Sequence, residues 1–164
     1  MSGAGERPSA RKDVHERALG LLAVRQRSRR ELERRLLQAG FAADEVRDEL
    51  GRLERVGLLD DEAFARAVVE SRVGRRGESR RMIAGRLAQA GVDPGTATGA
   101  LEDIGGDEQE RADRIAAAKA LKLASLDPKV AFTRLYGFLA RRGYAPEVAH
   151  RAARRALALE ALEG

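Results

Sequence analysis

The stretch SRRELERRLLQAGF, residues 28–41, decides the fold of this chain. It combines helix-forming residues, leucines four positions apart, and a closing glycine followed by a large apolar residue: Leu32, Leu36, Gly40 and Phe41. The pattern returns twice with its glycines 51 and then 52 residues further on, as Ile83, Leu87, Gly91 and Val92 and as Leu135, Leu139, Gly143 and Tyr144. Such self-similarity predicts a repeat array whose units bury apolar faces against each other and present an extended surface to a partner.

Helix start and stop signals on either side of this stretch predict three helices in each repeat. We expect an all-α fold of nine helices in three tandem three-helix repeats, at residues 13–57, 58–106 and 107–164, after a disordered extension at residues 1–12. No run of alternating β-branched or aromatic residues indicates a strand. The array is expected to be elongated.

Capping boxes are predicted at three helix starts, where an N-cap side chain and an acidic residue three positions later can satisfy free backbone N–H groups. These pairs are Asp13 with Glu16, Ser28 with Glu31, and Asp107 with Glu110. Acidic residues 60–62 suit the positive end of a helix dipole. A helix that begins at Asp93 is expected to be weak because it is rich in glycine and threonine. The last helix is expected to reach about Leu162.

Two apolar helix faces follow from the spacing of hydrophobic residues. One consists of Val46, Leu50, Leu53 and Val56, and the other of Phe64, Ala67 and Val68. The aromatic residues, among them Phe132, Tyr136 and Phe138, are interpreted as core residues rather than as a platform for stacking bases.

Composition narrows the classes of function. The chain has 164 residues and no cysteine, which excludes disulfides, thiolate catalysis and cysteine-based zinc sites. No apolar run is long enough to span a membrane, and residues 1–13 lack the apolar segment of a signal peptide, so we expect a soluble protein of the cytoplasm that does not bind membranes.

No catalytic constellation is found in the sequence. His15 and His150 lie in different repeats without a metal-ligand or nucleophile partner at a meaningful spacing, and both are interpreted as ordinary helix residues. Residues 74–78 contain two glycines but no phosphate-loop motif, so ATP binding is not indicated. We therefore expect no enzyme activity, no cofactor and no metal site.

Basic residues are the best functional candidates. The formal net charge is +5, and arginines recur around the middle helix of each repeat. They can bind phosphate or carboxylate groups in a bidentate way. The alternative is a solvated helix face with salt bridges. The candidate partner-binding or DNA-binding residues are Arg25, Arg27, Arg29, Arg30, Arg34, Arg35, Arg72, Arg75, Arg76, Arg80, Arg81, Arg141 and Arg142.

The second and third helices of each repeat also have the outline of a helix-turn-helix. A sequence-specific DNA reader would place base-contacting residues early in its recognition helix. Here those helices begin with acidic or apolar residues, at positions 43–45, 94–96 and 146–148. Sequence-specific DNA recognition is therefore disfavoured.

The order and spacing of four motifs resemble the RecX family of bacterial recombinase regulators. The motifs are Arg25-x2-Ser28-x2-Glu31-Leu32-x3-Leu36-x3-Gly40-Phe41, then Leu58-Leu59-Asp60-Asp61-x2-Phe64-Ala65 with Arg72 and Gly77, then Leu87-x3-Gly91-Val92, and Phe138-Leu139-x-Arg141-Arg142-Gly143-Tyr144. The resemblance covers about residues 13–160.

The resemblance implies a curved array that binds the RecA recombinase filament on single-stranded DNA and lodges in its helical groove. It implies inhibition of ATP hydrolysis, strand exchange and coprotease activity, and so a role in recombination, DNA repair and the SOS response. Some family members also bind DNA directly. We expect a monomer. Two alternatives stay open: a general helical DNA-binding module without a recombinase partner, and a structural scaffold.

Overall fold

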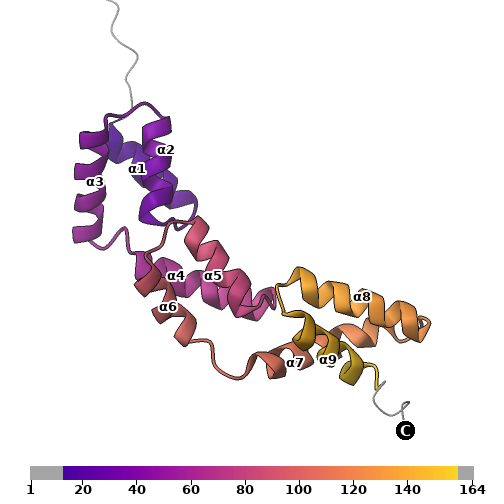
Figure 1. Cartoon of the computed structure of the whole chain (residues 1–164). Coiled ribbons are helices and arrows are strands. Elements are labelled where there is room, and N and C mark those ends of the chain that lie inside the picture. Colours follow the sequence, from indigo (N-terminus) through magenta and orange to yellow (C-terminus); the bar gives the residue numbers. More distant parts are fainter. Residues whose placement is uncertain (1–12, 159–164) are drawn as a thin grey trace, which may run out of the picture. The chain divides into compact units, whose positions relative to one another are not determined.

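A computed structural model describes residues 13–158, which form nine α-helices and no strand (Figure 1). The helices are α1 (Val14–Val24), α2 (Arg29–Gln38), α3 (Ala43–Arg55), α4 (Asp61–Glu70), α5 (Arg80–Gln89), α6 (Pro94–Glu102), α7 (Glu108–Ala120), α8 (Pro128–Arg141) and α9 (Pro146–Ala156). A π-helical turn (Ser71–Arg75) extends α4, and a 3-10 turn (Leu121–Leu123) extends α7. The all-α prediction is confirmed, and the predicted disordered extension lies outside the described residues.

The chain divides into two compact units. Among the described residues, the first contains residues 13–64 together with Ala90–Val92, and the second contains Ala65–Gln89 and residues 93–158. Three of the four residues between α5 and α6 therefore belong with the first unit.

The first unit has a core of aliphatic side chains from α1, α2 and α3. Its buried residues are Ala18, Leu32, Leu36, Val46, Leu50, Leu53 and Leu59. The turn from α2 into α3 passes through Gly40, whose φ of 91° lies in the left-handed region that favours glycine. The stretch at residues 28–41 thus encodes both a core face and the turn that ends it.

A polar pair lies beside this core. Nδ1 of His15 on α1 is 2.5 Å from a carboxylate oxygen of Glu49 on α3, and the Glu49 side chain is only 5% exposed. His15 therefore links two helices through a nearly buried carboxylate.

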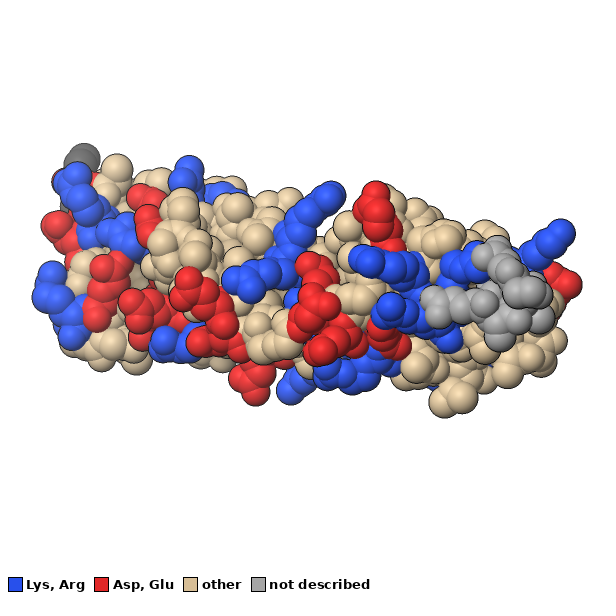
Figure 2. All heavy atoms as spheres, turned by 60° about the horizontal axis from the view of Figure 1, so that its bottom comes forward, with Lys and Arg blue, Asp and Glu red and all other residues tan. Residues whose placement is uncertain are grey.

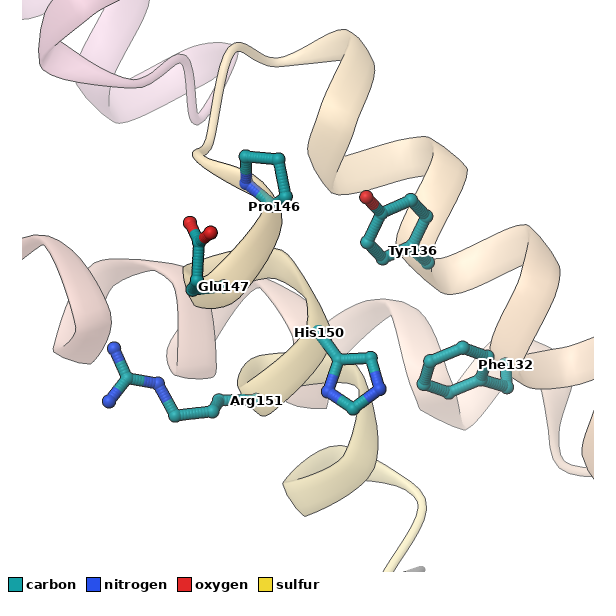
Figure 3. Close-up of a pocket in the computed structure, with 6 residues that line it drawn as sticks. All are labelled: Phe132, Tyr136, Pro146, Glu147, His150 and Arg151. Atoms are coloured by element: carbon teal, nitrogen blue, oxygen red, sulfur yellow. The ribbon is translucent and has the colours of Figure 1, made fainter.

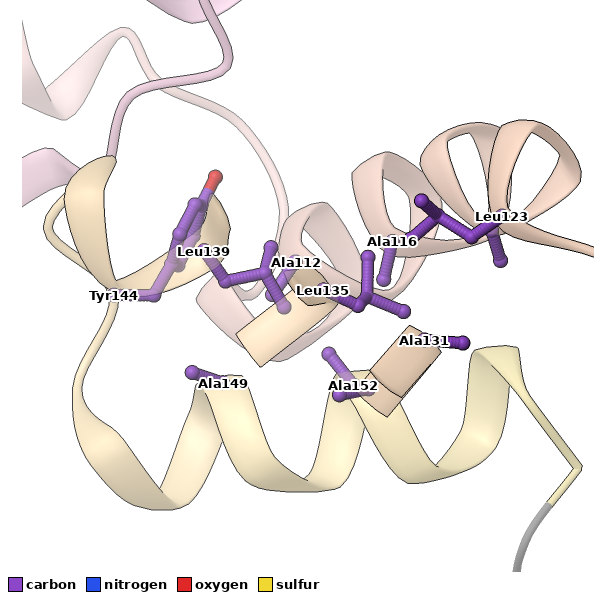
Figure 4. Packing of buried hydrophobic residues seen from close by; sticks show 11 residues of the cluster. Ala112, Ala116, Leu123, Ala131, Leu135, Leu139, Tyr144, Ala149 and Ala152 are labelled. Atoms are coloured by element: carbon purple, nitrogen blue, oxygen red, sulfur yellow. The ribbon is translucent and has the colours of Figure 1, made fainter. Parts of the chain in front are cut away.

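The second unit has an alanine-rich core where α7, α8 and α9 pack together (Figure 4). Ala112, Ala116 and Ala120 of α7 are buried with three alanines of α9. Small side chains allow helix axes to approach closely. Leu135 and Leu139 of α8 are fully buried in the same cluster.

Two of the predicted capping boxes are wrong. Asp13 and Asp107 occupy N-cap positions, but neither side chain makes a cap hydrogen bond. Ser28 caps α2, since its Oγ accepts from the backbone N–H of Glu31 at 3.1 Å. The helix predicted to be weak forms as α6, with the Asp93 carboxylate accepting from Gly95 N–H at 2.9 Å.

The predicted apolar faces need two corrections. Val56 is 63% exposed because α3 ends at the preceding residue; Leu58 and Leu59 instead bond back to the Leu53 carbonyl, and Leu59 is buried. On α4, Ala67 is exposed and Val68 is half-buried. The buried residues of that helix are Phe64, Ala65 and Val69, a face rotated from the predicted one.

The last helix also differs from its prediction. α9 ends at Ala156 rather than near Leu162, and Ala158 has a positive φ of 53°. Residues 159–164 lie outside the described part of the chain. Among the described residues, no helix has the length and apolar character needed to cross a membrane.

Candidate functional site

A buried serine at the start of α2 contacts the turn between α5 and α6. Ser28 is fully buried, and its Oγ donates to the Ala90 carbonyl at 2.6 Å while it caps α2. The side chain of Arg30 lies against Gly91, because a Cβ added at Gly91 would be 2.7 Å from the Cβ of Arg30. We call such a contact, between the serine at the start of one repeat's middle helix and the glycine turn of the next repeat, a serine joint.

The same joint recurs in the second unit. Ser79 is fully buried at the start of α5, and its Oγ accepts from the Met82 N–H at 3.2 Å. Its backbone N–H donates to the carbonyl of Arg142 at 2.8 Å, next to Gly143. A Cβ added at Gly143 would lie 2.5 Å from Ser79 Oγ. Two serines that follow the same sequence pattern therefore join two glycine turns.

This second joint brings the predicted arginines of the second and third repeats together. Nε of Arg142 donates to the Arg76 carbonyl at 3.0 Å, and the hydroxyl of Tyr144 donates to the Gly77 carbonyl at 3.0 Å. The loop before Ser79 is thus bound to the turn between α8 and α9. The arginines at this place, which we call the junction cluster, are Arg75, Arg76, Arg80, Arg81, Arg141 and Arg142.

Arg142 has a structural part in the junction cluster. Its guanidinium carbon lies 3.6 Å from the centroid of the Phe138 ring, a favourable cation–π contact. Burial, followed by repulsion from Arg141, lowers the pKa of Arg142 below its usual range. The other five arginines of the cluster are exposed.

A nearly buried carboxylate next to Ser79 ties the same loop to α5 and to the π-helical turn. Glu78 is 6% exposed; it accepts from Arg86 at 2.7 and 2.9 Å and from Arg72 at 3.2 Å. Burial alone would raise the pKa of Glu78, but hydrogen bonding and charge from Arg86 and Arg72 outweigh it, so the pKa lies below its usual range. Arg72 is therefore a support of the loop, and Arg86 is a support that the sequence analysis missed.

The arginines of the first unit divide in the same way. Arg27 is 7% exposed and donates to the Leu21 carbonyl at 3.2 Å; burial, then repulsion from Arg25 and Arg35, lowers its pKa. Arg25 pairs with Glu31 at 3.1 Å, and Arg29 pairs with Glu54. Three of the predicted binding residues in this unit are thus engaged in the fold, while Arg30, Arg34 and Arg35 are exposed.

Charge on one face of the molecule is mixed rather than of one sign. On the face shown in Figure 2, acidic side chains lie among the basic ones. A local cluster such as the one around Ser79 is therefore a better candidate for anion binding than a whole face. Within residues 13–158, no group of three or more histidine, aspartate or glutamate side chains could hold a metal ion.

Another arginine that the sequence analysis missed closes a loop. Arg111 on α7 is 8% exposed and donates to the carbonyls of Gly105 and Gly106 at 2.9 and 2.6 Å. These carbonyls precede α7 and come five or six residues earlier in the sequence. In the sequence, this contact is indicated only by a basic residue that follows two glycines by five to six positions.

Comparisons with known proteins agree with the three-helix repeats. Family models described as the first, second and third three-helix domains of RecX match residues 15–53, 60–101 and 107–153. The chain is 39% identical over 145 residues to the regulatory protein RecX of Mycobacterium avium, covering 87% of this chain and 83% of that one. It is 36% identical over 140 residues to the regulatory protein RecX of Amycolatopsis mediterranei, covering 85% and 80%.

The fold has solved counterparts as well. The crystal structure of RecX from Lactobacillus salivarius superposes with a TM-score of 0.70 at 19% identity, over 89% of this chain and 95% of that one. With three domain models in tandem and relatives that align over most of both sequences, this chain belongs to the RecX family of regulatory proteins.

Proposed function

We propose that this chain is a non-catalytic regulator that binds the RecA recombinase filament on single-stranded DNA, in the filament's helical groove. Its binding would inhibit ATP hydrolysis, strand exchange and coprotease activity, and so modulate recombination, DNA repair and the SOS response. Membership of a family of regulatory proteins supports the regulatory part. The partner and the inhibited activities come from the family resemblance.

The junction cluster is the observation that best supports a binding site. Five exposed arginines surround a loop whose last residues are held by the contact of Ser79 with the Arg142 carbonyl and by the ion pairs of the neighbouring Glu78 with Arg72 and Arg86. Because the backbone is held, less conformational freedom is lost when the side chains bind. Guanidinium groups presented in this way suit carboxylates on a protein or phosphates on DNA.

The same proposal places the protein in the cytoplasm as a monomer that needs no cofactor. It also assigns the repeat boundaries to 57/58 and 106/107. Each repeat would then contribute three helices and one glycine turn.

The test compares two charge-matched triple variants. One replaces Arg75, Arg80 and Arg81 of the cluster by glutamine, and the control replaces three exposed arginines of α3, namely Arg47, Arg52 and Arg55. ATP hydrolysis by RecA on preformed single-stranded DNA filaments is measured at substoichiometric amounts of each protein.

We expect the cluster variant to need about tenfold more protein for half-inhibition, since exposed ion pairs contribute roughly 0.5 kcal/mol each. The α3 variant should behave like wild type. Equal inhibition by both variants would exclude the cluster as the contact. Unaltered hydrolysis with wild-type protein, together with salt-sensitive binding to bare DNA, would favour the general DNA-binding module.

A further inference from the structure

An aromatic hollow is lined by residues of α8 and α9 and includes none of the arginines of the junction cluster. Its lining residues are Phe132, Tyr136, Pro146, Glu147, His150 and Arg151 (Figure 3). Its volume of about 700 Å³ is within the range of about 300–1,000 Å³ of sites that bind small organic groups. Most of the lining is apolar.

The rings of this hollow were interpreted from the sequence as core residues. Phe132 and Tyr136 are instead half-buried, and they pack on the edge of the alanine-rich core. Their rings are stacked with centroids 6.2 Å apart and planes 20° from parallel, and His150 meets Phe132 edge-on at 5.4 Å. Figure 3 shows the two α8 rings projecting beside His150 of α9.

The charge around the hollow selects the class of occupant. The segment that contains α8 and α9, from Pro128 to Ala156, has seven basic side chains and one acidic one; of these, Arg151 and the acidic Glu147 line the hollow itself. Arg151 is exposed, and it borders the hollow on the side of α9 away from the rings. An occupant with a flat ring and an attached negative charge matches both features, because aromatic side chains stack on the π-face of any base and nearby cations bind the phosphate.

We propose that this hollow stacks an unpaired base of a single-stranded nucleic acid, with Arg151 placed to bind the adjoining phosphate. A duplex would not suit the hollow, since its bases are already stacked on each other. This goes beyond the proposed function, in which the protein can act on the recombinase without touching a base.

The test measures binding of the full chain to a fluorescent thymidine oligonucleotide and to an abasic oligonucleotide of the same length and charge. We expect the intact strand to bind about tenfold more tightly, from the contribution of base–aromatic stacking. Phe132→Leu and Tyr136→Leu, which remove a ring but keep an apolar side chain, should each reduce that preference. His150→Ala serves as a third variant at an exposed position, in case a leucine variant fails to fold.

Two further measurements locate the contact. Arg151→Gln should weaken binding to both strands more than Arg134→Gln, a control at an exposed α8 residue outside the hollow. The chain has no tryptophan and two tyrosines, so its tyrosine emission should be quenched by the intact strand and not by the abasic one.

Equal affinity for the two strands, or no binding to either, would overturn the proposal. A preference for the intact strand that persists in all three ring variants would also overturn it, because the base would then be bound elsewhere. Weaker RecA inhibition by the ring variants without any oligonucleotide binding would show that the hollow binds protein. Since RecA inhibition is measured separately, the proposed function can stand or fail independently.

Discussion

The substitution Gly143→Ala should open the serine joint of the second unit. Gly143 has a φ of 88°, where a residue with a Cβ is disfavoured by roughly 1–2 kcal/mol. The new methyl would also lie 2.5 Å from Ser79 Oγ and 2.8 Å from Met82 Cβ. Ser79 is fully buried, so relief of this overlap requires the loop to move, which adds about 1–3 kcal/mol.

Gly106→Ala is the matched control. Gly106 is in the same unit with a φ of 79°, but the nearest atom to its added Cβ is 3.6 Å away, an ordinary contact. Gly106→Ala should therefore carry the backbone conformational cost alone. The difference in stability between the two variants then gives the cost of the overlap at the serine joint. The assay is amide hydrogen exchange at Ser79, whose N–H donates to the Arg142 carbonyl.

We expect Gly143→Ala to lower protection at the Ser79 amide about 5- to 140-fold more than Gly106→Ala does, since the overlap costs about 1–3 kcal/mol and every 1.4 kcal/mol is a factor of ten. It should also weaken RecA inhibition if the junction cluster is the contact. Equal protection in the two variants would refute the reasoning, because the overlap would then be absorbed without opening the joint.

Two further substitutions test the polar contacts. Glu78→Gln should destabilise the protein at pH 7 by about 1–3 kcal/mol, since two arginines lose a nearly buried carboxylate. The pKa of Glu78 is lowered in the folded state, so its contribution to stability is present above the reference value of 4.5 and is lost as pH falls through the folded-state pKa. Chemical denaturation should therefore show the difference in unfolding free energy between wild type and variant becoming smaller on acidification. A difference that stays constant with pH would contradict this. Ser28→Asp should destabilise the first unit more than Ser28→Ala does, because the aspartate places a carboxylate against the Ala90 carbonyl. This is expected even though aspartate is a good N-cap residue. A thermal midpoint of the aspartate variant at or above that of the alanine variant would contradict this.

Local signals explain why the helices could be predicted. The N-cap of α2 and the turn at Gly40 depend on residues within a few positions of each other, and both were read correctly. The second hydrogen bond of Ser28 reaches Ala90, 62 positions away, and nothing in the local pattern indicates it. Cap geometry was also beyond the sequence, since Asp13 has the right residue type and makes no cap bond.

The arginines show the same limit for the candidate site. Counting charge placed Arg27 and Arg81 in one class, yet the first is 7% exposed and bonded to a carbonyl while the second is exposed. Whether a guanidinium group is buried in the fold or exposed to solvent depends on the helix face that carries it and on contacts from distant segments. The convergence of the second and third arginine sets likewise follows from the hydrogen bonds of Arg142 and Tyr144 across more than 60 positions. Their binding role stays a prediction.

Hydrogen-bonding capacity explains why serine suits the joint. A serine hydroxyl can donate and accept at once, whereas an ionised aspartate only accepts. Ser28 uses both capacities, toward the Ala90 carbonyl and the Glu31 amide. In the third repeat the middle helix, α8, has Asp127 as its N-cap; this residue is exposed, and its carboxylate accepts from the Lys129 amide at 2.9 Å. Both joint serines are followed in the sequence by two arginines. The buried serine therefore places exposed positive charge beside the joint, at Arg30 in the first repeat and at Arg80 and Arg81 in the second.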